Sequence, residues 1–152
     1  MVGFVLALAI GVKTVSFKAR GIRNNNPGNI RLTDIPWFGK VPNDLNTDGE
    51  FEQFWETENG IRAMARNLRT QYSVKGLMTI QELIGAWAPT TENDTAAYIA
   101  SVSEQTGVNP RDPFPVEKIP DLVRAIIRHE NGVMPYEPET VIAGVKRAGW
   151  RV

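Results

Sequence analysis

Apolar residues recur at helical spacing from residue 61 to the C-terminus of this 152-residue chain, and this pattern restricts its fold most. The first stripe has members three and four positions apart, as on one face of a helix: Ile61, Met64, Ala65, Leu68 and Tyr72. Further stripes lie at 80–87, 98–102, 122–127 and 141–145. The pattern predicts a mainly α-helical protein.

Local signals predict where these helices begin and end. Thr79 and Glu82 form a capping box, and either Asn93 or Asp94 can cap the next helix. Pro120 and Pro138 suit the first turns of two later helices. The breaks fall at proline or glycine: Pro89, Gly107, Gly132 and Gly149.

The chain before residue 61 has a different character. Between Gly21 and Gly49 the stretches "NNNPGN", "IPWFGK" and "NTDG" predict turns, with at most a short β-hairpin. We therefore expect one domain over residues 20–152, in which a small irregular or hairpin lobe joins a helical body.

Residues 1–19 form a separate apolar segment, and residues 2–12 carry no charge. This run is shorter than the roughly 20 residues that span a bilayer. It predicts a buried or weakly membrane-associating helix within residues 1–15, or alternatively an export signal.

Composition excludes several classes of function. The formal net charge is zero, so no general attraction to nucleic acid is expected. Cysteine is absent and there is one histidine, which excludes thiol chemistry and argues against a zinc site. We expect no metal and no cofactor.

Five bases precede Asp34, whereas seven acids and one base lie from Asp34 to Glu58, which would give two oppositely charged surfaces if the segments stay apart.

Glu130 is the strongest catalytic candidate. It continues the stripe of Leu122 and Ile126 on the last turn before Gly132. Burial among apolar groups and the negative end of the helix both raise a carboxyl pKa. A carboxyl kept neutral near pH 7 can act as the general acid in glycosidic cleavage. The alternative is that the last turn frays and Glu130 points into water.

Residues 87–99, "WAPTTENDTAAYI", supply further candidates. Trp87 and Tyr98 can present aromatic rings to a sugar, although both can equally be core residues. Glu92 lies beside a helix start, which favours its ionised form. Glu130 and Glu92 would then form a pair of carboxyls with opposite protonation preferences.

The Asn-rich turn, residues 24–29, is a candidate sugar-binding element. Its amides can donate to and accept from hydroxyl and N-acetyl groups, and its members are Asn24, Asn25, Asn26 and Asn29. Asparagines also serve turns for local reasons, because their side chains bond their own backbone.

Several of these motifs, in the same order, resemble a family of phage and prophage proteins often labelled virion structural proteins. The motifs are "RGIRNNNPGNIR", "WFG" at 37–39, "FEQF" with "GIRA", "WAPTTENDTAAYI" and "RAIIRHENG". The family is similar to the lysin carried in virions of enveloped double-stranded RNA phages. The resemblance covers roughly residues 20–148. It implies a lysozyme-like fold, a peptidoglycan substrate and action in the host periplasm during entry or lysis, and we include Trp37 among the sugar-binding candidates.

The "NPGNI" and "WAP" stretches are also loosely similar to bacterial glucosaminidases, but the position of the catalytic acid differs. Those enzymes usually carry their catalytic glutamate on a helix before the Asn-rich turn, whereas no acid precedes Asp34 here. We therefore expect either an enzyme in which Glu130 supplies the acid, or a non-catalytic virion protein that binds peptidoglycan or other virion proteins. For the enzyme, the resemblance implies that a lytic transglycosylase needs only one carboxyl. A muramidase needs a second.

Overall fold

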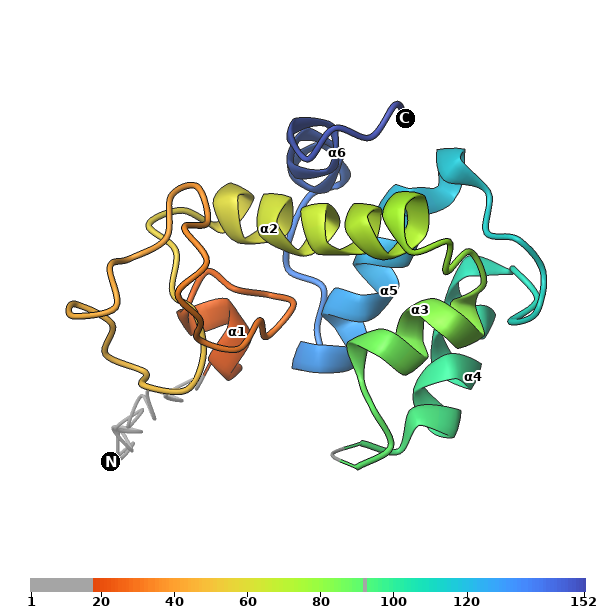
Figure 1. Ribbon diagram of the computed structural model, residues 1–152, viewed down its shortest axis with the longest axis horizontal. Helices are drawn as coiled ribbons and strands as arrows, with labels where there is room; N and C mark the ends of the chain where they lie inside the picture. The colour runs from red at the N-terminus through yellow and green to blue at the C-terminus, as the bar shows by residue number, and fades with distance from the viewer. Residues whose placement is uncertain (1–17, 92) are drawn as a thin grey trace, which may run out of the picture.

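The protein is described by a computed structural model over residues 18–91 and 93–152. Figure 1 shows a long helix, α2, beside the other helices of the body, with an irregular lobe at one end. The helices are α1 (Arg20–Arg23), α2 (Thr57–Arg69), α3 (Ile80–Trp87), α4 (Thr95–Thr106), α5 (Ile119–Asn131) and α6 (Pro138–Arg147). A π-helical turn, Thr70–Val74, extends α2, and a 3-10 turn, Val116–Lys118, precedes α5. The mainly α-helical fold class is confirmed.

The predicted caps lie at the observed helix ends. Thr79 and Glu82 form the reciprocal capping box of α3, and the Asp94 side chain accepts from the backbone N–H of Ala97 to cap α4. Gly107 and Gly132 end α4 and α5 with φ of 69° and 71°, a left-handed conformation that costs glycine little. Helix α5 begins at Ile119, so Pro120 occupies its second position.

The core forms where α5 packs against α2, α4 and α6. Each helix contributes the face that its apolar stripe defined, and the largest buried side chains include Ile61, Met64, Leu68, Ile80, Leu83, Tyr98, Leu122, Ile126 and Ile127. Burying a side chain of this size contributes roughly 1.5–3 kcal/mol. The buried stripe of α5 therefore fixes how its last turn, which carries Glu130, is oriented.

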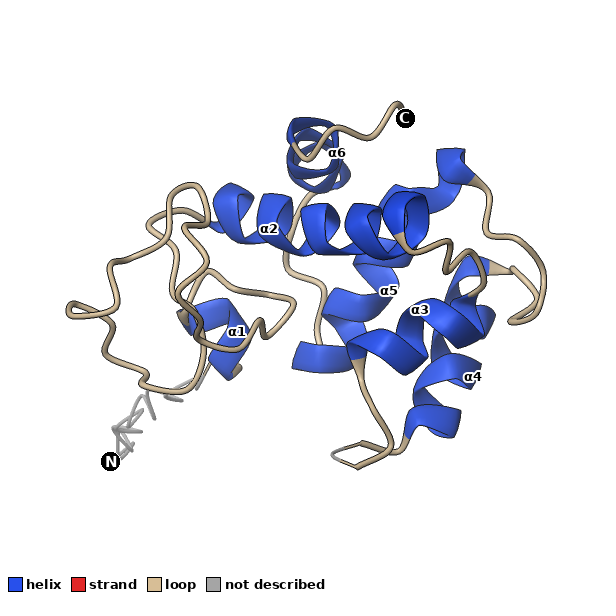
Figure 2. Ribbon diagram, viewed as in Figure 1, coloured by secondary structure: helices blue, strands red, loops and turns tan. Residues whose placement is uncertain are grey.

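The lobe between α1 and α2 is irregular. Figure 2 shows loops and no strand in this part of the described chain. Among the described residues, the lobe has only two isolated β-bridges, Arg31–Phe51 and Lys40–Phe54. The short hairpin that the sequence allowed therefore does not form there.

Charged pairs hold the lobe together. Arg20 donates two hydrogen bonds of 2.7 Å to Asp48, and Lys40 forms an ion pair of 2.9 Å with the fully buried Glu52. Arg20 lowers the pKa of Asp48 well below its usual value, and the Asn24 amide acts in the same direction. The two charged segments do not stay apart, as separate acidic and basic surfaces would require, because Arg20 of the basic run pairs with Asp48 and Glu50 of the acidic run.

Within the described residues, no helix has the length and apolar character needed to cross a bilayer. The prediction of membrane association concerned residues 1–15, which lie outside the described part of the chain.

Candidate functional site

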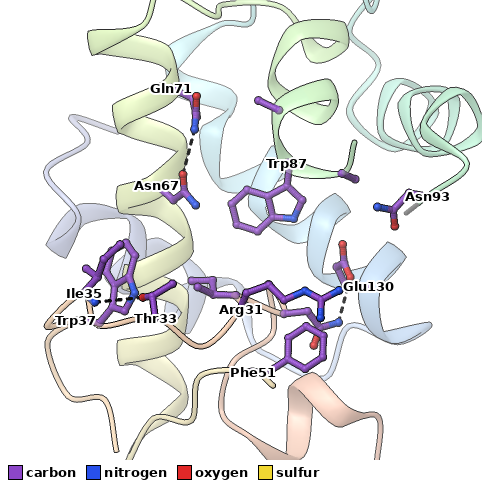
Figure 3. A pocket seen from close by; sticks show the side chains of 15 residues that line it. Arg31, Thr33, Ile35, Trp37, Phe51, Asn67, Gln71, Trp87, Asn93 and Glu130 are labelled. Carbon is purple, nitrogen blue, oxygen red and sulfur yellow. Dashed lines mark hydrogen bonds between the residues drawn. The ribbon is translucent and has the colours of Figure 1, made fainter. Parts of the chain in front are cut away.

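A cleft of about 370 Å³ lies between α2, the ends of α3 and α5, and the lobe. Figure 3 shows side chains from all of these elements pointing into it. Its lining includes Asn29, Arg31, Thr33, Trp37, Phe51, Asn67, Gln71, Trp87, Asn93 and Glu130. Among the described residues that line the cleft, Glu130 is the only one with a carboxyl group.

Two hydrogen bonds hold the carboxyl group of Glu130. The phenol of Tyr98 donates to Oε1 at 2.8 Å, and the amide of Asn29 donates to Oε2 at 3.0 Å. Glu130 is half-buried, because the apolar stripe of α5 reaches the cleft at this turn. The side chain is thus neither enclosed in the core, as the stripe suggested, nor swung into bulk water.

Tyr98 reaches Glu130 from inside the protein. Its side chain is only 1% exposed, and its ring stacks on that of His129 with centroids 3.6 Å apart. Burial raises the pKa of Tyr98 far above its usual value, and the nearby Glu130 charge raises it further. The phenol therefore remains protonated and available as a donor. Because the ring is enclosed, it cannot serve as an open stacking surface for a sugar.

Asn29 reaches Glu130 through a constrained turn. Its φ of 48° is left-handed, a conformation that asparagine tolerates better than most residues. The neighbouring carbonyl of Pro27 accepts a 2.8 Å hydrogen bond from the Asn131 amide, which ties the turn to the end of α5. Gly28 lies against Trp87 and Met64, with no room for a larger side chain. The turn is therefore packed against α2, α3 and α5 together.

The other three asparagines of the turn bond within the protein. Asn24 donates to Asp48 at 2.8 Å, and Asn25 donates to the carbonyl of Phe54 at 3.0 Å. Asn26 is fully buried and donates to the carbonyls of Ile30 and Glu52. An irregular segment leaves backbone groups without regular partners, and the amides of Asn25 and Asn26 supply them. Of the four, only Asn29 lines the cleft.

Both candidate tryptophans line the cleft. Trp37 comes from the lobe and Trp87 from the end of α3, as Figure 3 shows. Glu92 lies outside the described residues.

Sequence reasoning missed a polar pair on α2 and its extension. Asn67 and Gln71 lie four positions apart and line the cleft, and the Gln71 amide donates to Asn67 at 3.4 Å. The available signal was an i, i+4 amide pair just off the apolar stripe of Met64 and Leu68. Arg31 and Phe51 also line the cleft, with the guanidinium of Arg31 4.8 Å from the ring centre of Phe51.

Nothing in the described residues suggests a metal centre, since they contain no cluster of three or more potential ligands. The described residues that line the cleft offer one carboxyl, one guanidinium, several amides and two indoles. Such a site can bind a neutral polar ligand by hydrogen bonding and stacking, and can transfer a proton at Glu130.

Comparison with known proteins relates the chain to a phage protein. The chain is 40% identical over 143 residues to "Protein P5" of Pseudoalteromonas phage PM2, which covers 91% of this chain and 88% of that protein. No family model matches the chain.

Proposed function

The chain belongs to the family of phage proteins that includes Protein P5 of phage PM2, and from this premise we propose that it is a virion-associated enzyme that cleaves the glycan strand of peptidoglycan. The observation that carries the proposal is the Glu130 carboxyl, which Tyr98 and Asn29 orient at the wall of a cleft. In the proposal the helical body and irregular lobe form a lysozyme-like domain, and the protein acts on the cell wall in the host periplasm.

The lining of the cleft suits an N-acetylated sugar chain. The amides of Asn29, Asn67 and Gln71 can each donate and accept, as hydroxyl and acetamido groups require. Trp37 and Trp87 supply apolar faces for the flat side of a sugar ring. The lack of acids other than Glu130 among the described lining residues also fits a substrate recognised chiefly through neutral groups.

In the proposed reaction Glu130 protonates the oxygen that links muramic acid to glucosamine. The bond from that oxygen to the anomeric carbon breaks, and the sugar becomes an electrophile with oxocarbenium character. In a lytic transglycosylase the C6 hydroxyl of the same sugar attacks the anomeric carbon, and its proton returns to the Glu130 carboxylate. In a muramidase water attacks instead, which requires a second carboxyl about 5–9.5 Å from the first. The single carboxyl in the described lining favours the transglycosylase.

Digestion of purified sacculi tests the proposal. We expect the native protein to release soluble fragments with anhydro ends, detected by mass spectrometry, and Glu130→Gln to release about 10²–10⁴-fold less. Glu104→Gln, on the exposed side of α4, is the matched control and should act as the native protein. Reducing ends would indicate a muramidase. Equal release by native protein and Glu130→Gln would exclude the assigned role of Glu130.

A non-catalytic peptidoglycan-binding virion protein is the second candidate function. It is favoured because both oxygens of Glu130 already accept protein hydrogen bonds, as in a purely structural contact. In that case native protein and Glu130→Gln would both sediment with sacculi, and neither would release soluble fragments.

A further inference from the structure

A second concavity lies on another part of the surface, between α4 and α5. These helices pack against each other, as Figure 1 shows, and the notch between them has a volume of about 210 Å³. It is lined by Gln105, Asp121, Arg124, Ala125 and Arg128. None of these residues lines the cleft that contains Glu130.

Arg124 provides the strongest indication of a ligand here. Its Nη1 is buried and has no hydrogen-bond partner in the described structure. A guanidinium has five N–H donors, no acceptor and a permanent charge, so a buried unpaired Nη1 calls for an anionic or polar partner. Buried donors without partners are rare in proteins and commonly mark an unoccupied ligand or water position.

Arg128 lies one helical turn after Arg124, on the same side of α5. The two guanidiniums therefore border one small space and can each donate to one oxyanion. Asp121 carries one negative charge beside two positive ones, which leaves the notch with a net charge of one positive. That balance matches a carboxylate better than a phosphate dianion, and the small volume admits the end of a chain.

We propose that the notch of Arg124 and Arg128 binds the C-terminal carboxylate of a short peptide. Arg124 would turn its guanidinium so that Nη1 donates to the carboxylate, and Arg128 would donate from the rim. Gln105 can contact the peptide amide next to the carboxylate. Binding at the notch requires no glycan cleavage, so Glu130→Gln should bind such a peptide as the native protein does.

Titration by NMR tests the site, with N-acetyl-Ala-Ala bearing a free C-terminal carboxylate as the probe. We expect saturable shifts at the arginine Nε–H resonances and at the backbone of residues 105, 124, 125 and 128. Arg124→Gln and Arg128→Gln should each weaken binding about tenfold or more, since each removes a charged donor. Arg111→Gln, an exposed arginine outside the notch, is the control and should leave binding unchanged.

Other probes and outcomes separate the alternatives. The same dipeptide with a C-terminal amide should not bind, and inorganic phosphate should bind more weakly than the carboxylate. Because Arg128 is exposed, its substitution should preserve the fold, which the unchanged resonances of the remaining residues would verify. Absence of saturable shifts, binding as tight as that of the native protein in both notch variants, or preference for phosphate would overturn the proposal.

Discussion

The phenol of Tyr98 donates a 2.8 Å hydrogen bond to Oε1 of Glu130 and thereby joins the first half of α4 to the last turn of α5. The rest of the tyrosine is enclosed, and its ring is stacked on His129. Its position is therefore set by packing. The Glu130 carboxyl takes its orientation from a rigid donor on one oxygen and from Asn29 on the other.

Tyr98→Phe should impair catalysis without unfolding the protein, because it removes only the donor and keeps the ring. Glu130 becomes a carboxylate as it gives up its proton, and a hydrogen bond to a charged group contributes about 1.5–3 kcal/mol. We therefore expect kcat to fall by about tenfold or more. KM should stay near the native value, since the ring does not face the cleft. Kinetics on a soluble glycan fragment measure both constants. A native kcat would show that Tyr98 has no role in orienting Glu130.

Substitutions at Asn29 should separate backbone strain from loss of the amide. Asn29→Gly and Asn29→Ala both remove the donor to Glu130, but only alanine is strained at a φ of 48°. We expect Asn29→Ala to be about 1–2 kcal/mol less stable than Asn29→Gly. Urea unfolding of the two variants measures this difference. Equal midpoints with equal slopes would contradict a strained left-handed residue at this position.

Helix positions were predictable because their signals are local. The apolar stripe of α2, the Thr79–Glu82 box of α3 and the glycine after α5 each lie within a few residues of the element they define. The irregular lobe had local signals for its turns but none for how those turns pack together. Its structure depends on contacts such as Arg20–Asp48, which join positions 28 residues apart.

The site was predictable by residue type but not by geometry. Helical spacing correctly placed Glu130 on the last turn of α5, and Asn29 and Tyr98 were candidates by their chemistry. Asn29 and Tyr98 lie 101 and 32 positions from Glu130 in the sequence. No local pattern predicts that their side chains meet its carboxyl group. The same limit explains why Asn26, chemically equivalent to Asn29, was not recognised as a buried support of the lobe.

Asp48 should make the stability of the protein depend on acidic pH. Arg20 lowers its folded-state pKa, so its contribution to stability is fully present above the unfolded-state pKa of about 3.9. That contribution is lost as the pH falls from there through the folded-state pKa. Asp48→Asn keeps the size of the side chain but cannot titrate. We expect its unfolding free energy to change less than that of the native protein between about pH 5 and pH 2. Urea unfolding at several pH values measures the slope, and parallel profiles would exclude Asp48 as the source.

Gly60 and Gly85 should respond in opposite directions to replacement by alanine, although both are helical. At Gly60, in α2, a Cβ atom would collide with the backbone carbonyl of Asn25, whereas at Gly85, in α3, the space is open. Overpacking typically costs about 1–3 kcal/mol, so Gly60→Ala should be destabilised by at least that amount. It should also lose activity, because the clash pushes the Asn-rich turn away from α2 and moves Asn29 relative to Glu130. Gly85→Ala should gain about 0.5–1 kcal/mol, since alanine loses less backbone entropy in a helix. Thermal and urea unfolding measure both effects. A stable, fully active Gly60→Ala would show that the turn does not depend on its contact with α2.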